Sequence, residues 1–167
     1  MNDRLTQSDI DKMQEEIDYR RHELAPKILQ AIKEAKAQGD LSENFEYHSA
    51  KREKAQNESR IRYLERMIRT AHIFEDKAGD DAVGMNNTVV VFSERANKEL
   101  TFRIVTTIRA NPILGLISIE SPVGKAIYGH RVGDRCHVEM ENGTGYDVVI
   151  RSIEKTTDDS GDKISSY

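Results

Sequence analysis

Two consecutive segments, residues 6–38 and 42–74, carry apolar side chains at spacings of three and four, and this periodicity constrains the fold more than any other feature. The spacing places the apolar residues of each segment on one stripe of an α-helix. Gly39 and the polar residues after it are typical of a turn between the two helices. If the chain reverses there, antiparallel pairing brings Ile17 close to Leu64. The sequence therefore predicts a helical hairpin, with each helix roughly 45 Å long at about 1.5 Å per residue.

The middle of the predicted seam is polar. Lys54 and Asn57 occupy stripe positions and are expected to face residues 24–28 of the first helix. Pro26 lies in that stretch, where it removes a backbone hydrogen bond and is expected to kink the helix. Because the flanks of both helices are rich in charged residues, the hairpin is predicted to stand largely in solvent.

The second half of the chain changes to the alternating pattern of β-strands. The predicted strands are residues 88–92, 100–108, 115–120, 135–141 and 146–153. Ser121 as N-cap, Pro122 at the first helical position and Gly129 as the stop predict one short helix. This half is therefore predicted to be an α+β module, a small antiparallel sheet packed by a single helix.

These patterns divide the 167 residues into four parts. Residues 1–75 are assigned to the hairpin and residues 86–155 to the sheet domain. The acidic, glycine-containing residues 76–85 are predicted to be a linker, and the polar residues 156–167 are expected to be a disordered tail.

Composition excludes several classes of protein. The formal net charge of −4 gives no overall basicity to attract nucleic acid, so any such contact must be local or supplied by a partner. The single cysteine, Cys136, cannot form an intramolecular disulfide and is expected to lie in the core. Residues 1–4 lack the pattern of a signal peptide, and no apolar run approaches the roughly 20 residues of a membrane span. We therefore expect a cytoplasmic protein that does not contact a membrane.

The predicted hairpin ends in acidic residues. Asp40 and Glu43 lie three positions apart where the first helical pattern stops and the second begins. One interpretation is a probe that carries negative charge into another molecule. The other is an ordinary solvated turn with Asp40 as helix N-cap, because Gly, Asp, Ser and Asn are also common in turns and caps.

The sequence from Gly39 to Lys51, GDLSENFEYHSAK, resembles the signature of the bacterial Gre transcript cleavage factors. Residues 121–134, SPVGKAIYGHRVGD, resemble the C-terminal signature of the same family, and the likeness extends in order from about Leu5 to Ile153. The resemblance implies an N-terminal antiparallel coiled-coil hairpin and a C-terminal domain with an FK506-binding-protein-like fold. Both agree with the two halves inferred from periodicity.

The resemblance also implies a function. Gre factors insert their coiled coil into the secondary channel of bacterial RNA polymerase, where they stimulate cleavage of the 3′ end of backtracked nascent RNA. By motif position, Asp40 and Glu43 would be the catalytic carboxylates and would help to hold a Mg²⁺ ion shared with polymerase. Hard carboxylate oxygens suit Mg²⁺, and phosphodiester hydrolysis benefits from two metal ions. The factor would therefore not be an enzyme by itself, and we expect it to act as a monomer.

The remaining residues of the tip are given supporting roles by motif position. Leu41 and Ser42 complete the tip, and Ser42 falls at a variable position. Asn44 and Glu46 are expected to hold the turn by hydrogen bonds, and Tyr47 by packing across the seam. Phe45 stands where the family often has Ala, and is expected to pack on Leu41 or to meet polymerase. The RNA-contact candidates are the cations that flank the tip, Lys36, Lys51 and Arg52.

Two other functions remain to be distinguished from cleavage. A Gre-like regulator or inhibitor could occupy the same channel without promoting cleavage, and a purely structural coiled coil would have no use for the acidic motif. The C-terminal domain is expected to dock at the rim of the channel. The charges along the hairpin are nearly balanced, which favours GreA-type over GreB-type behaviour.

Overall fold

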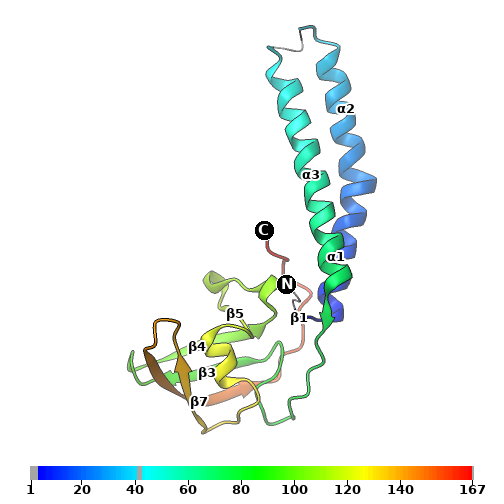
Figure 1. Ribbon diagram of the computed structural model, residues 1–167. Coiled ribbons are helices and arrows are strands. Elements are labelled where there is room, and N and C mark those ends of the chain that lie inside the picture. The colour runs from blue at the N-terminus through cyan, green and yellow to red at the C-terminus, as the bar shows by residue number, and fades with distance from the viewer. Residues whose placement is uncertain (1–3, 41–42, 167) are drawn as a thin grey trace. The chain divides into compact units, whose positions relative to one another are not determined.

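The computed structural model describes residues 4–40 and 43–166 and divides the chain into two compact units. One unit comprises Gln7–His72, and the other comprises Arg4–Thr6 with the chain from Ile73 onward. The first is a helical hairpin and the second is built on a β-sheet (Figure 1). The α+β class predicted from the sequence is confirmed, with the boundary at residues 72 and 73.

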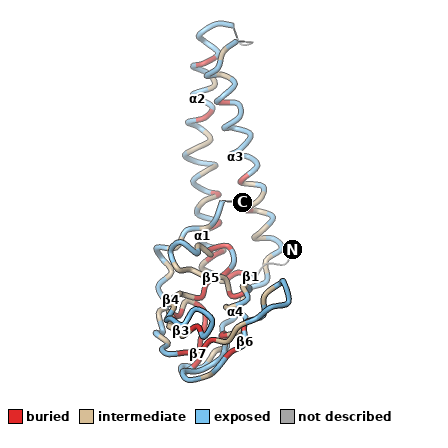
Figure 2. Tube along the Cα trace, turned by 90° about the vertical axis from the view of Figure 1, so that its left-hand side faces the viewer, coloured by how far each residue is buried: buried red, intermediate tan, exposed pale blue. Residues whose placement is uncertain are grey.

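The hairpin consists of one interrupted helix and one continuous helix. Helix α1 (Gln7–Tyr19) leads through a π-helical segment (Arg20–Leu24) into α2 (Ala25–Lys36), and α3 (Phe45–Thr70) returns beside them (Figure 1). Most residues of the hairpin are exposed or intermediate, and only a few positions along its helices are buried (Figure 2). The buried residues of the helices are Asp9, Met13, Ile17, Ile28, Ala35, Ala50, Asn57, Arg60 and Leu64. The predicted antiparallel hairpin with a narrow seam is therefore confirmed.

Where a kink was expected near Pro26, the structure has a π-helical segment, Arg20–Leu24, immediately before α2. Pro26 lies in the first turn of α2 and has no N–H for the carbonyl of His22, four residues earlier. Immediately before it, the N–H of Ala25 bonds to the carbonyl of Arg20, five residues back. A wider turn thus accommodates the proline without ending the helix.

The polar part of the seam lies closer to the N-terminus than predicted. Asn57 faces Arg20, not residues 24–28: its Nδ2 donates to the Arg20 carbonyl at 3.2 Å, and its Oδ1 accepts from the Arg20 guanidinium at 3.0 Å. Lys54, predicted to share the seam, is exposed and pairs with Glu58 on its own helix. The π-helical turn changes the phase of the first helix, which displaces the facing residues relative to a regular heptad.

A carboxylate completes this polar cluster. Glu16 accepts from the Arg60 guanidinium at 2.7 and 3.1 Å and from Arg20 Nε at 2.9 Å. Burial by itself would raise the pKa of Glu16, but the hydrogen bonds and charges of Arg60 and Arg20 outweigh it and hold the pKa below its usual range. Arg60 and Asn57 each meet a partner from the other side of the hairpin. These directional contacts favour one register over others that apolar contacts alone would allow.

The second unit is built on a five-stranded sheet of order β5-β4-β3-β7-β6. Its strands are β3 (Thr88–Ser93), β4 (Lys98–Val105), β5 (Leu116–Ser118), β6 (Arg135–Glu139) and β7 (Gly145–Glu154). The short strands β1 (Arg4–Leu5) and β2 (His72–Ile73) form a separate two-stranded sheet.

The antiparallel sheet predicted from the sequence is corrected to a mixed one. Strand β5 runs parallel to β4, whereas the other pairs are antiparallel. The predicted second strand also ends three residues early, because the 3₁₀ turns Thr107–Arg109 and Pro112–Leu114 follow β4. Alternating polarity indicates the two faces of a strand but not the direction in which it pairs.

A short helix packs on this sheet as predicted. Helix α4 (Pro122–Ile127) begins at Ser121, whose Oγ accepts the N–H of Gly124 at 3.1 Å, and lies against β5 and β6. Gly129 follows the helix with a φ of 80°, a backbone conformation that suits glycine. The core of this unit is aliphatic and includes Cys136, as predicted. Burial raises the pKa of its thiol, with a smaller contribution from the charge of Asp134.

The stretch predicted as a linker is tied to the second unit. Asp76 accepts hydrogen bonds from the Met85 N–H at 2.8 Å and from the Tyr128 hydroxyl at 2.6 Å. Burial, followed by the contact with Asp76, raises the pKa of Tyr128 to about 12. Ala82 also forms a β-bridge with Arg131.

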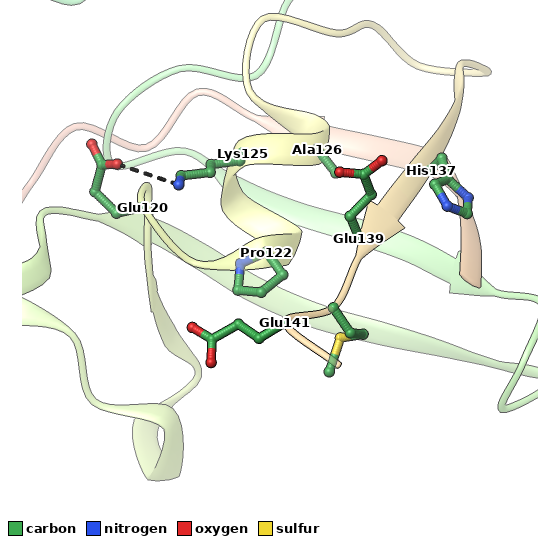
Figure 3. Close-up of a pocket in the computed structure, with 8 residues that line it drawn as sticks. Glu120, Pro122, Lys125, Ala126, His137, Glu139 and Glu141 are labelled. Carbon is green, nitrogen blue, oxygen red and sulfur yellow. Dashed lines mark ion pairs between the residues drawn. The ribbon is translucent and has the colours of Figure 1, made fainter. Parts of the chain in front are cut away.

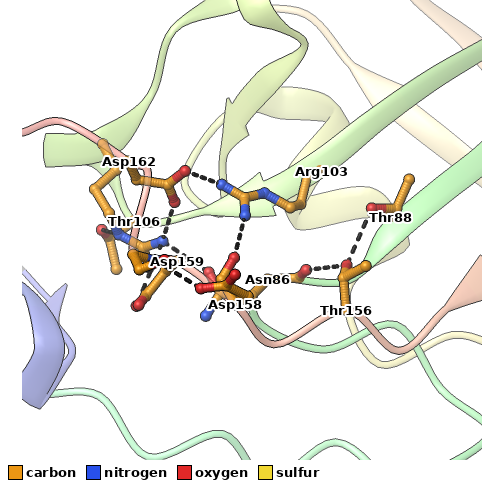
Figure 4. A network of polar contacts seen from close by, with 10 residues as sticks. Asn86, Thr88, Arg103, Thr106, Thr156, Asp158, Asp159 and Asp162 are labelled. Atoms are coloured by element: carbon orange, nitrogen blue, oxygen red, sulfur yellow. Dashed lines mark hydrogen bonds and ion pairs between the residues drawn. The ribbon is translucent and has the colours of Figure 1, made fainter.

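The expectation of a disordered tail is corrected for residues 156–166. Asp162 pairs with Arg103 and, at 2.8 Å, with Arg109, while the carbonyl of Asp158 accepts from Arg103 at 2.8 Å (Figure 4). The Arg109 side chain is 0% exposed and that of Asp162 is 9% exposed. Further along, the N–H of Ser165 bonds to the Ile108 carbonyl at 2.8 Å. The low hydrophobicity that predicted disorder is offset here by charge pairing with a buried arginine.

This pairing predicts an acid-sensitive contribution to stability. Burial of Asp162 opposes ionisation, but Arg103 and Arg109 together hold its pKa below the ordinary 3.8. Asp162 therefore stabilises the folded chain above that pH, and the contribution is lost as the pH falls through the lowered pKa. We expect the difference in unfolding free energy between the wild type and Asp162→Asn to shrink below about pH 3.8. Denaturant titrations between pH 3 and 7 measure it, and a constant difference would contradict the assignment.

Candidate functional site

The described end of the hairpin is held together by Asn44. Its side chain caps α3 by accepting the N–H of Tyr47 at 3.0 Å and donates to the carbonyl of Ala35 at 2.7 Å. The amide of Asn44 thus provides a hydrogen-bond partner for a backbone N–H in the first turn of α3 and for a carbonyl in the last turn of α2. Asn44, not Asp40, is the N-cap of the returning helix. Asp40 is therefore not needed as a helix cap, which removes one of the two roles that its residue type suggested.

Both acidic candidates lie in the short connection between α2 and α3. Asp40 and Glu43 are exposed, and each lies within four residues of Asn44. Leu41 and Ser42, the tip residues between them, lie outside the described residues. Of the other acids near the tip, Glu46 is exposed on the first turn of α3. The connection thus presents carboxylates to solvent next to a rigidly capped helix.

Cations accompany the aromatic residues of this end. The ammonium groups of Lys36 and Lys51 lie 5.9 and 5.3 Å from the ring centre of the half-buried Tyr47. The guanidinium of Arg52 lies 6.0 Å from the ring centre of Phe45. The three RNA-contact candidates are exposed and are brought together with the aromatic residues of α3. Such cations can attract phosphate while their stems stay on the rings.

The acidic residues of the connection offer oxygen donors of the kind that Mg²⁺ prefers. Within residues 4–40 and 43–166, no group of three or more His, Cys, Asp or Glu side chains could hold a metal ion. Two exposed carboxylates supply hard oxygen ligands, of which Mg²⁺ needs only one or two from a protein when water and phosphate supply the rest. Asp40 and Glu43 could therefore supply at most two of the ligands of such an ion.

The second unit contains an open cleft of about 500 Å³ beside α4 and β6 (Figure 3). Its lining residues are Glu120, Pro122, Lys125, Ala126, His137, Glu139, Met140 and Glu141. The acids stand around a partly apolar floor, and Lys125 pairs with Glu120 at 4.0 Å (Figure 3). This combination lacks the convergent set of nucleophile, base and orienting group that a catalytic site requires.

Sequence reasoning missed two polar clusters, and both join segments far apart in the chain. One is the seam cluster of Glu16, Arg20, Asn57 and Arg60, and the other is the pairing of the tail aspartates with Arg103 and Arg109. Asn57, a polar residue in an otherwise mostly apolar stripe, was the sequence signal for the seam cluster. The run of aspartates at 158–162 could have suggested the second only if a basic partner had been known.

A helical hairpin with an acidic, capped end, joined to a mixed-sheet domain, is the architecture of a class of transcription elongation factors. The model of the transcription elongation factor N-terminal domain of GreA and GreB matches residues 4–73, and the GreA/GreB C-terminal model matches residues 78–155. The chain belongs to the GreA/GreB transcription elongation factor family.

Two relatives named transcription elongation factor GreA agree with this assignment. The transcription elongation factor GreA of Agrobacterium fabrum is 39% identical over 147 residues, which cover 87% of this chain and 93% of that protein. GreA of Caldanaerobacter subterraneus is 41% identical over 140 residues, covering 83% and 89% of the two chains. A solved structure of GreA factor homolog 1 from Thermus thermophilus is 26% identical, with a TM-score of 0.42 and coverage of 92% and 99%. The preference for the GreA type is confirmed by the relatives of that name. No helix in the described residues has the length and apolar character to cross a membrane.

Proposed function

We propose that this chain acts on bacterial RNA polymerase in the cytoplasm, where its hairpin enters the secondary channel and stimulates cleavage of backtracked RNA. The observation that carries the proposal is the exposed pair Asp40 and Glu43 at the capped end of a hairpin in a GreA/GreB family member. Burying an unpaired charged group costs free energy, whereas a charged group at an exposed tip stays hydrated. In this position the two carboxylates are accessible to another molecule.

The two carboxylates would assist the two requirements of phosphodiester hydrolysis. Hydrolysis of a phosphodiester requires an activated water and stabilisation of the leaving oxygen, and a bound Mg²⁺ assists both when it is present. Asp40 and Glu43 would hold that ion together with ligands from polymerase and would orient the attacking water by accepting its hydrogen bonds. Asn44 positions this short connection by its bonds to both helices. The chain would thus lend groups to another enzyme and have no nuclease activity of its own.

The second unit is proposed to dock at the rim of the channel. It exposes large apolar side chains, among them Ile113 at 95% and Leu114 at 70%, in the turn after β4. Exposed apolar residues that lie together mark interaction surfaces. Docking there would leave the hairpin to reach the active centre as a monomer.

A direct assay tests the function. A stalled, backtracked elongation complex is mixed with the protein and Mg²⁺, and 3′ RNA fragments are followed on a gel. We expect fragments to appear much faster than with polymerase alone, and none when the protein is mixed with RNA in the absence of polymerase. A factor that competes for the channel but leaves cleavage unchanged would instead be a channel regulator or inhibitor. Cleavage by the isolated protein would contradict the proposed division of labour.

A further inference from the structure

Phe45 is a large aromatic residue that the hairpin leaves uncovered. It is the first residue of α3, and 75% of it is exposed. Ala50, five residues later, is buried in the seam. Five residues correspond to about 500° of helical rotation, so Phe45 points about 140° away from that buried position. The ring therefore faces away from α2.

A cation lies beside this ring. Arg52 follows Phe45 by seven residues, about two turns, and so shares its side of the helix. Its guanidinium lies 6.0 Å from the ring centre. The next aromatic residue, Tyr47, carries two more cations, Lys36 and Lys51. The described end of the hairpin therefore combines an open aromatic face with positive charge, a few residues from the proposed catalytic carboxylates.

We propose that Phe45 is a stacking platform for an unpaired base of the RNA 3′ segment, and that Arg52 binds the adjoining phosphate. The inference rests on the proposed function, since that function brings single-stranded RNA to this end of the hairpin. Proteins that bind single strands combine aromatic faces, on which bases stack, with cations that contact the backbone. By holding the base, Phe45 would help to fix the scissile phosphate relative to Asp40 and Glu43.

Charge favours RNA over an apolar pocket of polymerase as the occupant of this surface. A pocket that covered Phe45 would also remove water from Arg52, which is costly unless the pocket supplies an anion. A nucleotide offers a π-face and a phosphate in one ligand. RNA and an apolar pocket require different properties of the side chain at position 45. Stacking on a base needs an aromatic ring, whereas an apolar pocket accepts an aliphatic side chain of similar volume.

The test is a substitution series crossed with a modified RNA. Backtracked complexes are prepared with normal RNA or with one abasic nucleotide, placed in turn at each extruded position. Cleavage rates at subsaturating protein are compared for the wild type, Phe45→Ala, Phe45→Leu and Phe45→Trp. On normal RNA we expect about a 10-fold loss for the Ala and Leu variants, from the stacking contribution, and retention by Trp. At one abasic position, the wild type should fall to the rate of Phe45→Ala, and that variant should lose nothing further.

Each result decides the proposal. Full activity of Phe45→Leu would overturn stacking in favour of an apolar contact with polymerase. The proposal would also be overturned if the ratio of the wild-type cleavage rate to the Phe45→Ala rate were the same at every abasic position as on normal RNA. If the wild type fails to stimulate cleavage at all, the proposed function itself fails, which is a different outcome from active protein without base dependence. Thermal unfolding followed by circular dichroism checks that the variants retain the hairpin, as the exposure of Phe45 predicts.

Discussion

Replacement of Asp40 by Asn, or of Glu43 by Gln, is expected to lower stimulated RNA cleavage about 100-fold, since loss of a metal-orienting carboxylate costs several kcal/mol in the transition state. Both side chains are exposed, so the neutral amides should not disturb the hairpin. Affinity for polymerase should remain nearly unchanged, because docking is assigned to other surfaces. Single-turnover cleavage of a backtracked complex at saturating protein separates the chemical step from binding.

Glu53 provides the matched control for this loss. It lies in α3 and is exposed like Glu43. Glu53→Gln removes one negative charge from the same hairpin outside the tip motif, and we expect cleavage within about twofold of the wild type. An equal loss in all three variants would indicate a general effect of negative charge and would reject specific roles for Asp40 and Glu43.

The dependence on Mg²⁺ gives a second readout of the same assignment. If the carboxylates help to hold the ion, each amide variant should need a higher Mg²⁺ concentration for half-maximal cleavage, because an amide oxygen is a weaker ligand than a carboxylate. Glu53→Gln should keep the wild-type requirement. An unchanged Mg²⁺ requirement in the Asp40 and Glu43 variants would remove them from the metal site and leave only water orientation as their role.

The sequence predicts those parts of the fold that depend on local pattern. The three-and-four spacing identified both helices, Pro26 marked the irregular turn, and Ser121 with Pro122 located the start of α4. Each is a property of residues within a few positions of one another. The acidic tip also lies within one short segment, so its motif could be recognised before any tertiary contact was known.

The parts that the sequence did not predict depend on contacts between distant segments. Strand β5 joins β4 in parallel because of the path of the chain through two 3₁₀ turns, which alternating polarity does not encode. The tail is ordered because Asp162 meets arginines more than fifty residues earlier in the chain. A polar segment with few apolar residues ordinarily remains unfolded. Here a buried guanidinium supplies the missing stabilisation, and its burial cannot be inferred from the charge of the residue.

Loss of the contact between the tail and Arg109 is expected to have a large effect on stability. Asp162→Asn should lower the unfolding free energy of the sheet unit by about 3 kcal/mol, because removing one member of a buried ion pair leaves the other charge without full compensation. Arg109 is fully buried and Asp162 nearly so, and the carboxylate of Asp159 is farther from Arg109, at 3.9 Å. Hydrogen exchange of the β3 and β4 amides in the full chain measures this unit separately from the hairpin.

An exposed ion pair in the same unit is the control for that substitution. Glu94 accepts from Arg135 at 2.8 Å, and both residues are exposed, so Glu94→Gln should cost less than about 1 kcal/mol. The double variant Arg109→Met with Asp162→Asn should recover part of the loss seen in Asp162→Asn, because no buried guanidinium then remains to be compensated. If Asp162→Asn costs no more than Glu94→Gln, the tail does not stabilise the fold through Arg109. The single variant Arg109→Met completes the comparison. If the loss of unfolding free energy in the double variant equals the sum of the losses in Asp162→Asn and Arg109→Met, the two side chains are not energetically coupled.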